Sequence, residues 1–328
     1  MSASIGLRFN EIDLMRGFAC VVVVLYHYVS RSPQVGWMNG IELPVLGAVA
    51  RYGYLGVHLF FVISGFVILM SARSATPQEF IAARAARLLP ALWVAASVTA
   101  LTAWITSDVR FMVSIQNYLI NLTMVPHWFK VPYVDGAYWS LAYELHFYIY
   151  VWLALRFGLM ARIDWLLAAW LLVSTINAAR PMWPAEFWLT AKWAPFFAAG
   201  ALFYLVRTDG VRPQRVALLV VCYALAMVYS MRDATASRSV IDGLTGPDAA
   251  QVMIVGGIVS LIFGVFTLVA RGAWTMEASA LTAVSGALTY PLYLIHQYFG
   301  AMVYGRLLDL LGTPLIALAM TLFVVLAV

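Results

Sequence analysis

The sequence predicts an all-α fold, a polytopic membrane bundle of about ten transmembrane helices. Hydrophobic residues make up 63% of the 328 residues and charged residues only 11%. An ordinary soluble domain has about 45–50% apolar and 25% charged residues, so this composition excludes one. The net charge of +5 could indicate nucleic-acid binding. The basic residues, however, punctuate apolar runs as membrane topology requires, so no nucleic-acid partner is expected.

Ten apolar segments are long enough to cross a bilayer, although the fifth and sixth are short and flanked by proline. They cover residues 12–29, 54–71, 88–106, 139–156, 165–177, 193–206, 216–231, 252–270, 290–308 and 312–328. A weaker segment, 111–125, is interrupted by polar residues and is expected to be re-entrant or interfacial. With no internal repeat or linker, the pattern predicts one integral domain over 1–328 and no appended soluble domain.

The distribution of Lys and Arg around these segments predicts the orientation in the membrane. With the N-terminus in the cytoplasm, eleven of the twenty basic residues, Arg8 among them, flank the inner side and nine flank the outer side. The inner loops are also shorter and denser in positive charge. This favours a cytoplasmic N-terminus. The two cysteines, Cys20 and Cys222, lie in apolar segments without metal-ligand spacing, so no metal is expected.

The first apolar segment carries two ionisable residues, Arg16 and His27, which are eleven positions apart. Eleven steps of roughly 100° end about 20° past three full turns, so both side chains share one face, about 16 Å apart along the axis. Such residues cost ~2.5–3.5 kcal/mol each in hydrocarbon and usually mark an interior cavity or pathway. The structural alternatives are that Arg16 reaches the headgroups and that His27 satisfies a polar neighbour.

Further polar signals lie along the chain. Thr76, Pro77 and Glu79 form a capping pattern that predicts the start of a helix running through Arg84 and Arg87. These two arginines share a face and suit either anionic lipid headgroups or the phosphates of a ligand.

Three more ionisable side chains lie inside apolar segments. Glu144 belongs to a helix rich in aromatic residues and is expected to face an Arg or His in the bundle, as a functional group or as a structural ion pair. His58 and His296 suit either a catalytic role or a hydrogen-bonded place in the core.

Five motifs follow one another along the chain. They are Arg16 with ten residues before His27, Gly53-Tyr54-Leu55-Gly56-Val57-His58-Leu59-Phe60-Phe61-Val62-Ile63-Ser64-Gly65-Phe66, Arg84-Ala85-Ala86-Arg87, Trp139-Ser140-Leu141 with Glu144, and Tyr290-Pro291-Leu292-Tyr293-Leu294-Ile295-His296. In this order and spacing, over nearly the whole chain, the sequence resembles the acyltransferase-3 family of integral membrane acyltransferases.

The resemblance implies a bacterial O-acyltransferase of the inner (cytoplasmic) membrane. Such an enzyme moves an acetyl or other acyl group from cytoplasmic acetyl-CoA to a sugar hydroxyl of an exopolysaccharide, lipopolysaccharide or lipid-linked glycan. A homodimer is compatible with this resemblance. The sequence departs from the family at His58, where an acidic residue is common, and at Leu145-His146, where a second carboxylate commonly stands beside Glu144. Both departures bear on the proton route.

The chemistry of the proposed reaction suggests roles for these residues. A sugar hydroxyl is a weak nucleophile at neutral pH, so attack on a thioester needs a base with a pKa near 7, which favours His27. Arg16 would lie lower on the path of the donor or be structural. Glu144 would orient His27, as the carboxylate does in a catalytic triad, or would pair with Arg16.

The predicted donor-binding set extends from the arginine pair to residues of other motifs. Ser64 could also act as a nucleophile, or it could simply be a small residue at a helix contact. The predicted set is Arg84, Arg87, Ser64, His58 and His296.

Two other classes of protein fit part of the pattern. A transporter or flippase for a glycan or lipid carrier would also need buried charges near the midplane. A non-catalytic partner in a polysaccharide assembly complex is the third possibility. The missing internal repeat and the ordered motifs favour the enzyme.

Overall fold

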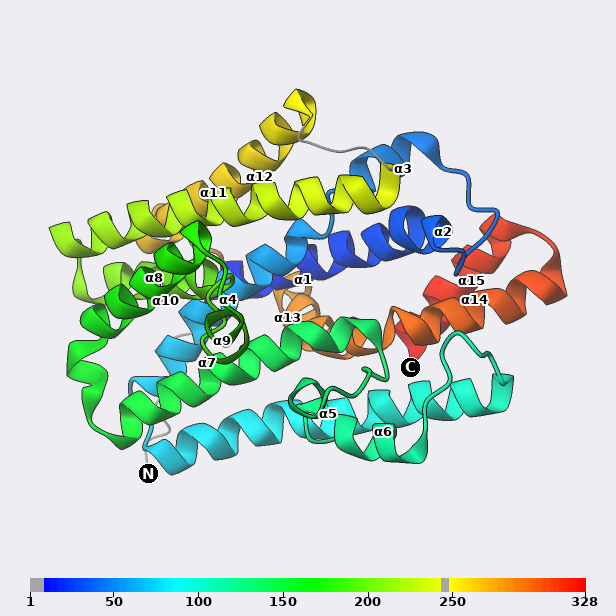
Figure 1. Cartoon of the computed structure of the whole chain (residues 1–328), viewed down its shortest axis with the longest axis horizontal. Helices are drawn as coiled ribbons and strands as arrows, with labels where there is room; N and C mark the ends of the chain where they lie inside the picture. Colours follow the sequence, from blue (N-terminus) through cyan, green and yellow to red (C-terminus); the bar gives the residue numbers. More distant parts are fainter. Residues whose placement is uncertain (1–8, 243–247) are drawn as a thin grey trace.

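The computed structural model describes residues 9–242 and 248–328, with side chains placed except at 237–242. Arg8, one of the basic residues on which the predicted orientation depends, lies outside the described residues. The described chain forms a helical bundle without β-strands, in which the longer helices lie roughly parallel or antiparallel to one another (Figure 1). The all-α prediction is therefore confirmed.

The elements follow one another along the whole described chain. They are α1 (Asn10–Leu25), the π-helix η1 (Tyr26–Arg31), α2 (Ser32–Gln34), α3 (Pro44–Ala50), α4 (Leu55–Ala72), α5 (Pro77–Thr106), α6 (Ile115–Asn121), η2 (Pro126–Phe129), η3 (Gly136–Tyr138), α7 (Trp139–Arg156), η4 (Leu159–Arg162), α8 (Ile163–Ala179), α9 (Trp183–Trp188), α10 (Ala194–Asp209), α11 (Pro213–Asp242), α12 (Ala249–Ala270), α13 (Ala280–Ile295), α14 (Tyr298–Leu311) and α15 (Pro314–Ala327).

Among the described helices, six are long and apolar enough to cross a membrane by length and composition. They include the continuous run 10–34 and the helices α5 and α12. Two shorter apolar helices, α13 and α15, add to them. These features define a multi-pass membrane protein.

The ninth predicted segment, 290–308, is not one helix. It is interrupted at His296 and Gln297, between α13 and α14, and α13 already begins at Ala280. Asp135 lies at this interruption, where its Oδ2 accepts the backbone N–H of Tyr298 at 2.7 Å and so caps the start of α14. The hydropathy of the segment is continuous across this point and could not reveal it.

The weaker segment 111–125 contributes only the short helix α6, which begins after the capping side chain of Ser114. Asn121 at its end is buried, and its amide nitrogen donates to the carbonyls of Asn117 and Pro132. The polar residues that interrupt this segment therefore hold a folded connection into α7 rather than a lipid-exposed span.

The centre of the bundle is the contact between α4 and α10. Gly65 of α4 and Gly200 of α10 allow it, because a Cβ at either position would overlap the backbone of the opposite helix. Around this pair, α1 packs against α4 and α13. The contacts of α1 with α4 and α13 bring the motifs on these three helices close to one another.

Candidate active site

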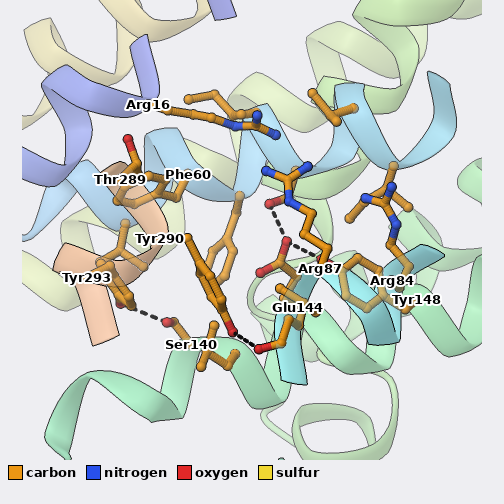
Figure 2. Close-up of a pocket in the computed structure, with 18 of the residues that line it drawn as sticks. Arg16, Phe60, Arg84, Arg87, Ser140, Glu144, Tyr148, Thr289, Tyr290 and Tyr293 are labelled. Carbon is orange, nitrogen blue, oxygen red and sulfur yellow. Dashed lines mark hydrogen bonds between the residues drawn. The ribbon is translucent and has the colours of Figure 1, made fainter. Parts of the chain in front are cut away.

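The two arginines of α5 line a cavity in the bundle, where Arg84 is half-buried and Arg87 is exposed. The helix begins as predicted, with the Thr76 hydroxyl accepting from the backbone N–H of Glu79 and the Glu79 carboxylate accepting from that of Thr76. Arg84 and Arg87 then line one cavity, called here the central cavity, together with Arg16 of α1 and Glu144 of α7. Figure 2 shows all four side chains reaching it from three helices.

Two of the three arginines in the central cavity have no ionic partner among the described side chains. Arg16 pairs with Asp13 of its own helix at 3.3 Å. Arg84 only rests over the ring of Phe80, and its buried Nε has no hydrogen-bond partner. Arg87 makes neither a hydrogen bond nor an ion pair within the described residues. Guanidinium groups left free in this way suit an anionic ligand.

Glu144 has partners other than the two we expected. Its Oε1 accepts the hydroxyl of Ser64 at 2.9 Å and that of Tyr148 at 2.7 Å. It faces Arg16 across the central cavity, but within the described residues it makes no direct contact with either Arg16 or His27. The predicted pairing with His27 or Arg16 is thus not present in the structure.

His27 contacts a second histidine instead. Its Nδ1 lies 3.0 Å from the carbonyl oxygen of Val23 and 3.0 Å from Nε2 of His296. The Nδ1 atom of His296 lies 2.8 Å from the carbonyl oxygen of Tyr293. Because a carbonyl only accepts, each Nδ1 carries the proton, and the single Nδ1–H of His27 is shared between the Val23 carbonyl and Nε2 of His296. Nε2 of His27 then keeps its lone pair.

His27 lies in another cavity, called here the histidine cavity, whose lining includes Arg31, His58, Trp193 and Asp233. His58 Nε2 is 3.6 Å from Asp233 Oδ2, and Lys192 Nζ is 2.5 Å from Asp233 Oδ1. His296 is completely buried behind His27. Of the residues predicted to bind the donor, His58 and His296 are therefore separated from Arg84, Arg87 and Ser64.

Several residues of the histidine cavity are not indicated by any pattern in the sequence. Lys192 and Asp233 lie at the ends of predicted segments, where a charged residue is ordinarily explained by solvent or headgroups. They come together only because the start of α10 and the later part of α11 lie at the same end of the bundle. A signal available in the sequence was the run of aromatic residues that begins α7 and precedes α10.

A third cavity, called here the end cavity, lies where the described chain begins, with Phe9 and Arg73 in its lining. It shares Arg16 and Arg87 with the central cavity, which in turn shares Val57 and Tyr293 with the histidine cavity. The three cavities therefore follow one another along the bundle. Tyr293, whose hydroxyl lies 2.7 Å from Ser140 Oγ, stands between the last two (Figure 2).

The loop before α7 holds the neighbourhood of His296 in place. Asp135 is fully buried there, and it accepts from the backbone of Tyr298 and of Ala137, the latter at 2.9 Å. Burial raises the pKa of Asp135 to about 7, although the backbone N–H groups oppose this shift. Among the described side chains, no group of three or more His, Cys, Asp or Glu residues could hold a metal ion.

Comparison with known proteins agrees with this arrangement of motifs. The family model described as "Acyltransferase domain", that of the acyltransferase-3 family, matches residues 9–328. The chain belongs to this family, and it is a membrane acyltransferase by that membership.

Three curated relatives share part of the sequence. "Exopolysaccharide production protein ExoZ" of Rhizobium meliloti (strain 1021) is 27% identical over 75% of this chain and 76% of its own. "Putative membrane-bound transacylase BcsY" of Komagataeibacter xylinus is 31% identical over 44% of this chain and 37% of its own. "Nodulation protein 10" of Rhizobium leguminosarum bv. viciae is 27% identical over 60% and 57%. No solved structure matches the chain.

Proposed function

We propose that this protein transfers an acetyl group from cytoplasmic acetyl-CoA to a sugar hydroxyl of an exopolysaccharide or a related membrane-associated glycan. The observation that carries the proposal is the succession of the end, central and histidine cavities, which leads from unpaired arginines to a histidine with a free lone pair. The name of ExoZ supports an exopolysaccharide acceptor. The predicted orientation would put the end cavity at the cytoplasmic side of the inner membrane.

Donor binding would begin at the arginines. Arg84 and Arg87 have free guanidinium groups that can form charge-assisted bonds to the phosphates of CoA. The pantetheine arm would then extend past Arg16 and along the central cavity, with its thioester near Tyr293 and His27. Arg16 lies on this path and is a binding residue in this proposal, rather than a group that reacts.

The acetyl transfer itself would use His27 as general base. Nε2 of His27 takes the proton of the sugar hydroxyl as the oxygen attacks the thioester carbonyl. A C–O bond forms, the C–S bond breaks, and the CoA thiolate takes the proton back from His27. His296 accepts the Nδ1–H of His27 and strengthens this bond when His27 becomes positively charged, as the carboxylate does in a catalytic triad. His296 is therefore a positioning residue here.

Glu144 has a different part in this proposal. Its carboxylate lies opposite the arginines and holds the hydroxyl of Ser64. It would balance the positive charge of the central cavity, and Ser64, whose hydroxyl donates to this carboxylate, lies in the central cavity and not beside His27 in the histidine cavity. A direct transfer from acetyl-CoA to the sugar therefore fits the side chains better than an acyl-serine intermediate.

The test is acetyl transfer from radiolabelled acetyl-CoA by the purified protein in detergent, with exopolysaccharide from a strain lacking the protein as acceptor. Label should appear in the glycan and be released as acetate by mild alkali, which cleaves esters. A transporter or a non-catalytic assembly partner would leave all label in the donor at every acceptor concentration. That result would overturn the proposal.

A further inference from the structure

Polar groups without partners gather in the histidine cavity. Neither ring nitrogen of His58 has a hydrogen-bond partner among the described residues, although the side chain is only 2% exposed. The distance of 3.6 Å between Nε2 of His58 and Oδ2 of Asp233 is too long for a hydrogen bond. The Tyr54 hydroxyl, in the same cavity, is also buried and unpartnered. Because buried polar groups are nearly always paired, these groups indicate a polar ligand.

Two indole rings form the apolar part of the same cavity. Trp139 and Trp193 lie with their ring centroids 5.4 Å apart and their planes inclined by 35°. Indole faces offer a large apolar area beside a polar N–H, which suits the mixed C–H and O–H surface of a sugar ring. The ion pair of Lys192 and Asp233 lies directly next to them. Lys192 Nζ lies over the Trp193 ring, 4.6 Å from its centroid, so the half-buried Trp139 offers the more accessible indole face. The ion pair supplies donors and acceptors for sugar hydroxyls.

The charge of the cavity is not balanced. Arg31, at the end of the π-helix η1, lines it half-buried, and its guanidinium makes no ion pair or hydrogen bond with any described residue. Lys192 and Asp233 neutralise each other. Among the Lys, Arg, Asp and Glu side chains of the lining, Arg31 alone is thus left without a partner of opposite charge. A planar guanidinium matches a carboxylate or a phosphate in particular.

We infer that the histidine cavity binds an anionic sugar acceptor, with its ring against Trp139 and its carboxylate or phosphate at Arg31. The hydroxyl to be acylated would then face His27. The cavity volume of about 380 Å³ lies within the range of ligand pockets, about 300–1,000 Å³. The inference deepens the proposed function and rests on it for the reaction, but the binding can be measured without any donor.

The experiment compares three small probes on the purified full-length protein in detergent, at low salt. They are methyl β-D-glucuronide, which carries a carboxylate, α-D-glucose 1-phosphate, which carries a phosphate, and the neutral methyl β-D-glucoside. Affinities come from quenching of tryptophan fluorescence. At least one anionic probe should bind tenfold or more tightly than the glucoside. If the glucuronide binds more tightly, the anion is a uronate of the glycan. If glucose 1-phosphate binds more tightly, it is the phosphate of a carrier.

Variants test whether Arg31 is the cause. Arg31→Gln should remove the preference for the anionic probe, whereas Arg31→Lys should keep part of it and shows that the substituted chain folds. Arg110→Gln is the matched control, because Arg110 lies near the same end and pairs with Asp108, outside the cavity. Its binding should equal that of the wild type. Trp139→Ala should weaken all three probes, since it removes an indole face.

Three results would overturn the inference: no binding of any probe, equal binding of all three, or an anion preference that survives in Arg31→Gln. Acetyl-CoA binding is measured on the same preparations to separate the two proposals. If acetyl-CoA binds and is used while the anionic probes do not bind, the acceptor inference fails alone. If the probes bind through Arg31 but no acetyl group ever leaves the donor, the proposed reaction fails alone.

Discussion

His27 and His296 lie ring to ring, with Nδ1 of His27 3.0 Å from Nε2 of His296. The backbone carbonyls of Val23 and Tyr293 fix which nitrogen of each ring carries the proton. His27 therefore presents an unprotonated nitrogen without the help of a carboxylate. The break between α13 and α14 lies at His296 itself, so the geometry of the pair depends on that break.

Substituting either histidine should lower turnover to different extents. His27→Ala and His27→Gln remove the base and should reduce kcat by ~10²–10⁴-fold. His296→Leu removes only an acceptor for a charged donor, a bond of ~1.5–3 kcal/mol, and should reduce kcat about 10–100-fold with the KM for acetyl-CoA unchanged. His296→Gln keeps an acceptor and should recover part of the loss. Near-wild-type turnover in a His27 variant would refute the assignment.

The paired substitution Arg84→Gln/Arg87→Gln should raise the apparent KM for acetyl-CoA and weaken binding of desulfo-CoA. Each arginine lost removes a charge-assisted bond to phosphate, which is worth ~1.5–3 kcal/mol. Arg162→Gln is the matched control, because this exposed arginine lies in η4, outside the three cavities. If the double variant binds desulfo-CoA normally and only its membrane insertion is impaired, the two arginines bind lipid headgroups instead.

Glu144 should contribute to stability through its two hydrogen bonds. Glu144→Ala leaves the hydroxyls of Ser64 and Tyr148 without their acceptor and should destabilise the fold by ~1–3 kcal/mol for each unsatisfied group. Glu144→Gln keeps an oxygen acceptor and should retain most of the stability. Thermal unfolding in detergent measures both variants. A Gln variant as unstable as the Ala variant would mean that the negative charge facing the arginines, and not the hydrogen bonds, is what matters.

Sequence patterns were sufficient for the all-α membrane fold, because apolar segments of bilayer length determine it. They could not show the break at His296, since the hydropathy is continuous there and the residue that caps α14, Asp135, lies more than 150 positions away. They also could not predict that Asp233 lies near His58, because that contact depends on how α11 packs. The motif residues Arg16, Arg84, Arg87 and Glu144 did prove to share one cavity. The partners of Glu144 and His27 had to be read from the structure.

Asp135 should make the stability of the protein depend on pH. Its pKa is raised to about 7 in the fold, mainly by burial, so the folded state disfavours the ionised form relative to the unfolded chain. The contribution of Asp135 to the free energy of unfolding is fully present below the unfolded pKa of about 3.9. It is lost as the pH rises from there through 7. Asp135→Asn keeps an oxygen that can accept the Tyr298 N–H but cannot ionise. It should therefore flatten this part of the profile.

The measurement is thermal unfolding in detergent between pH 4 and 8, compared between the wild type and Asp135→Asn, with acetyl transfer assayed in parallel. Asp135→Ala should behave differently, because it removes the cap of α14 and releases the segment that carries His296. It should lower both the unfolding temperature and kcat, whereas the Asn variant should retain kcat. A wild-type profile as flat as that of the Asn variant would show that Asp135 does not titrate in this range, and a fully active Ala variant would separate the cap from the position of His296.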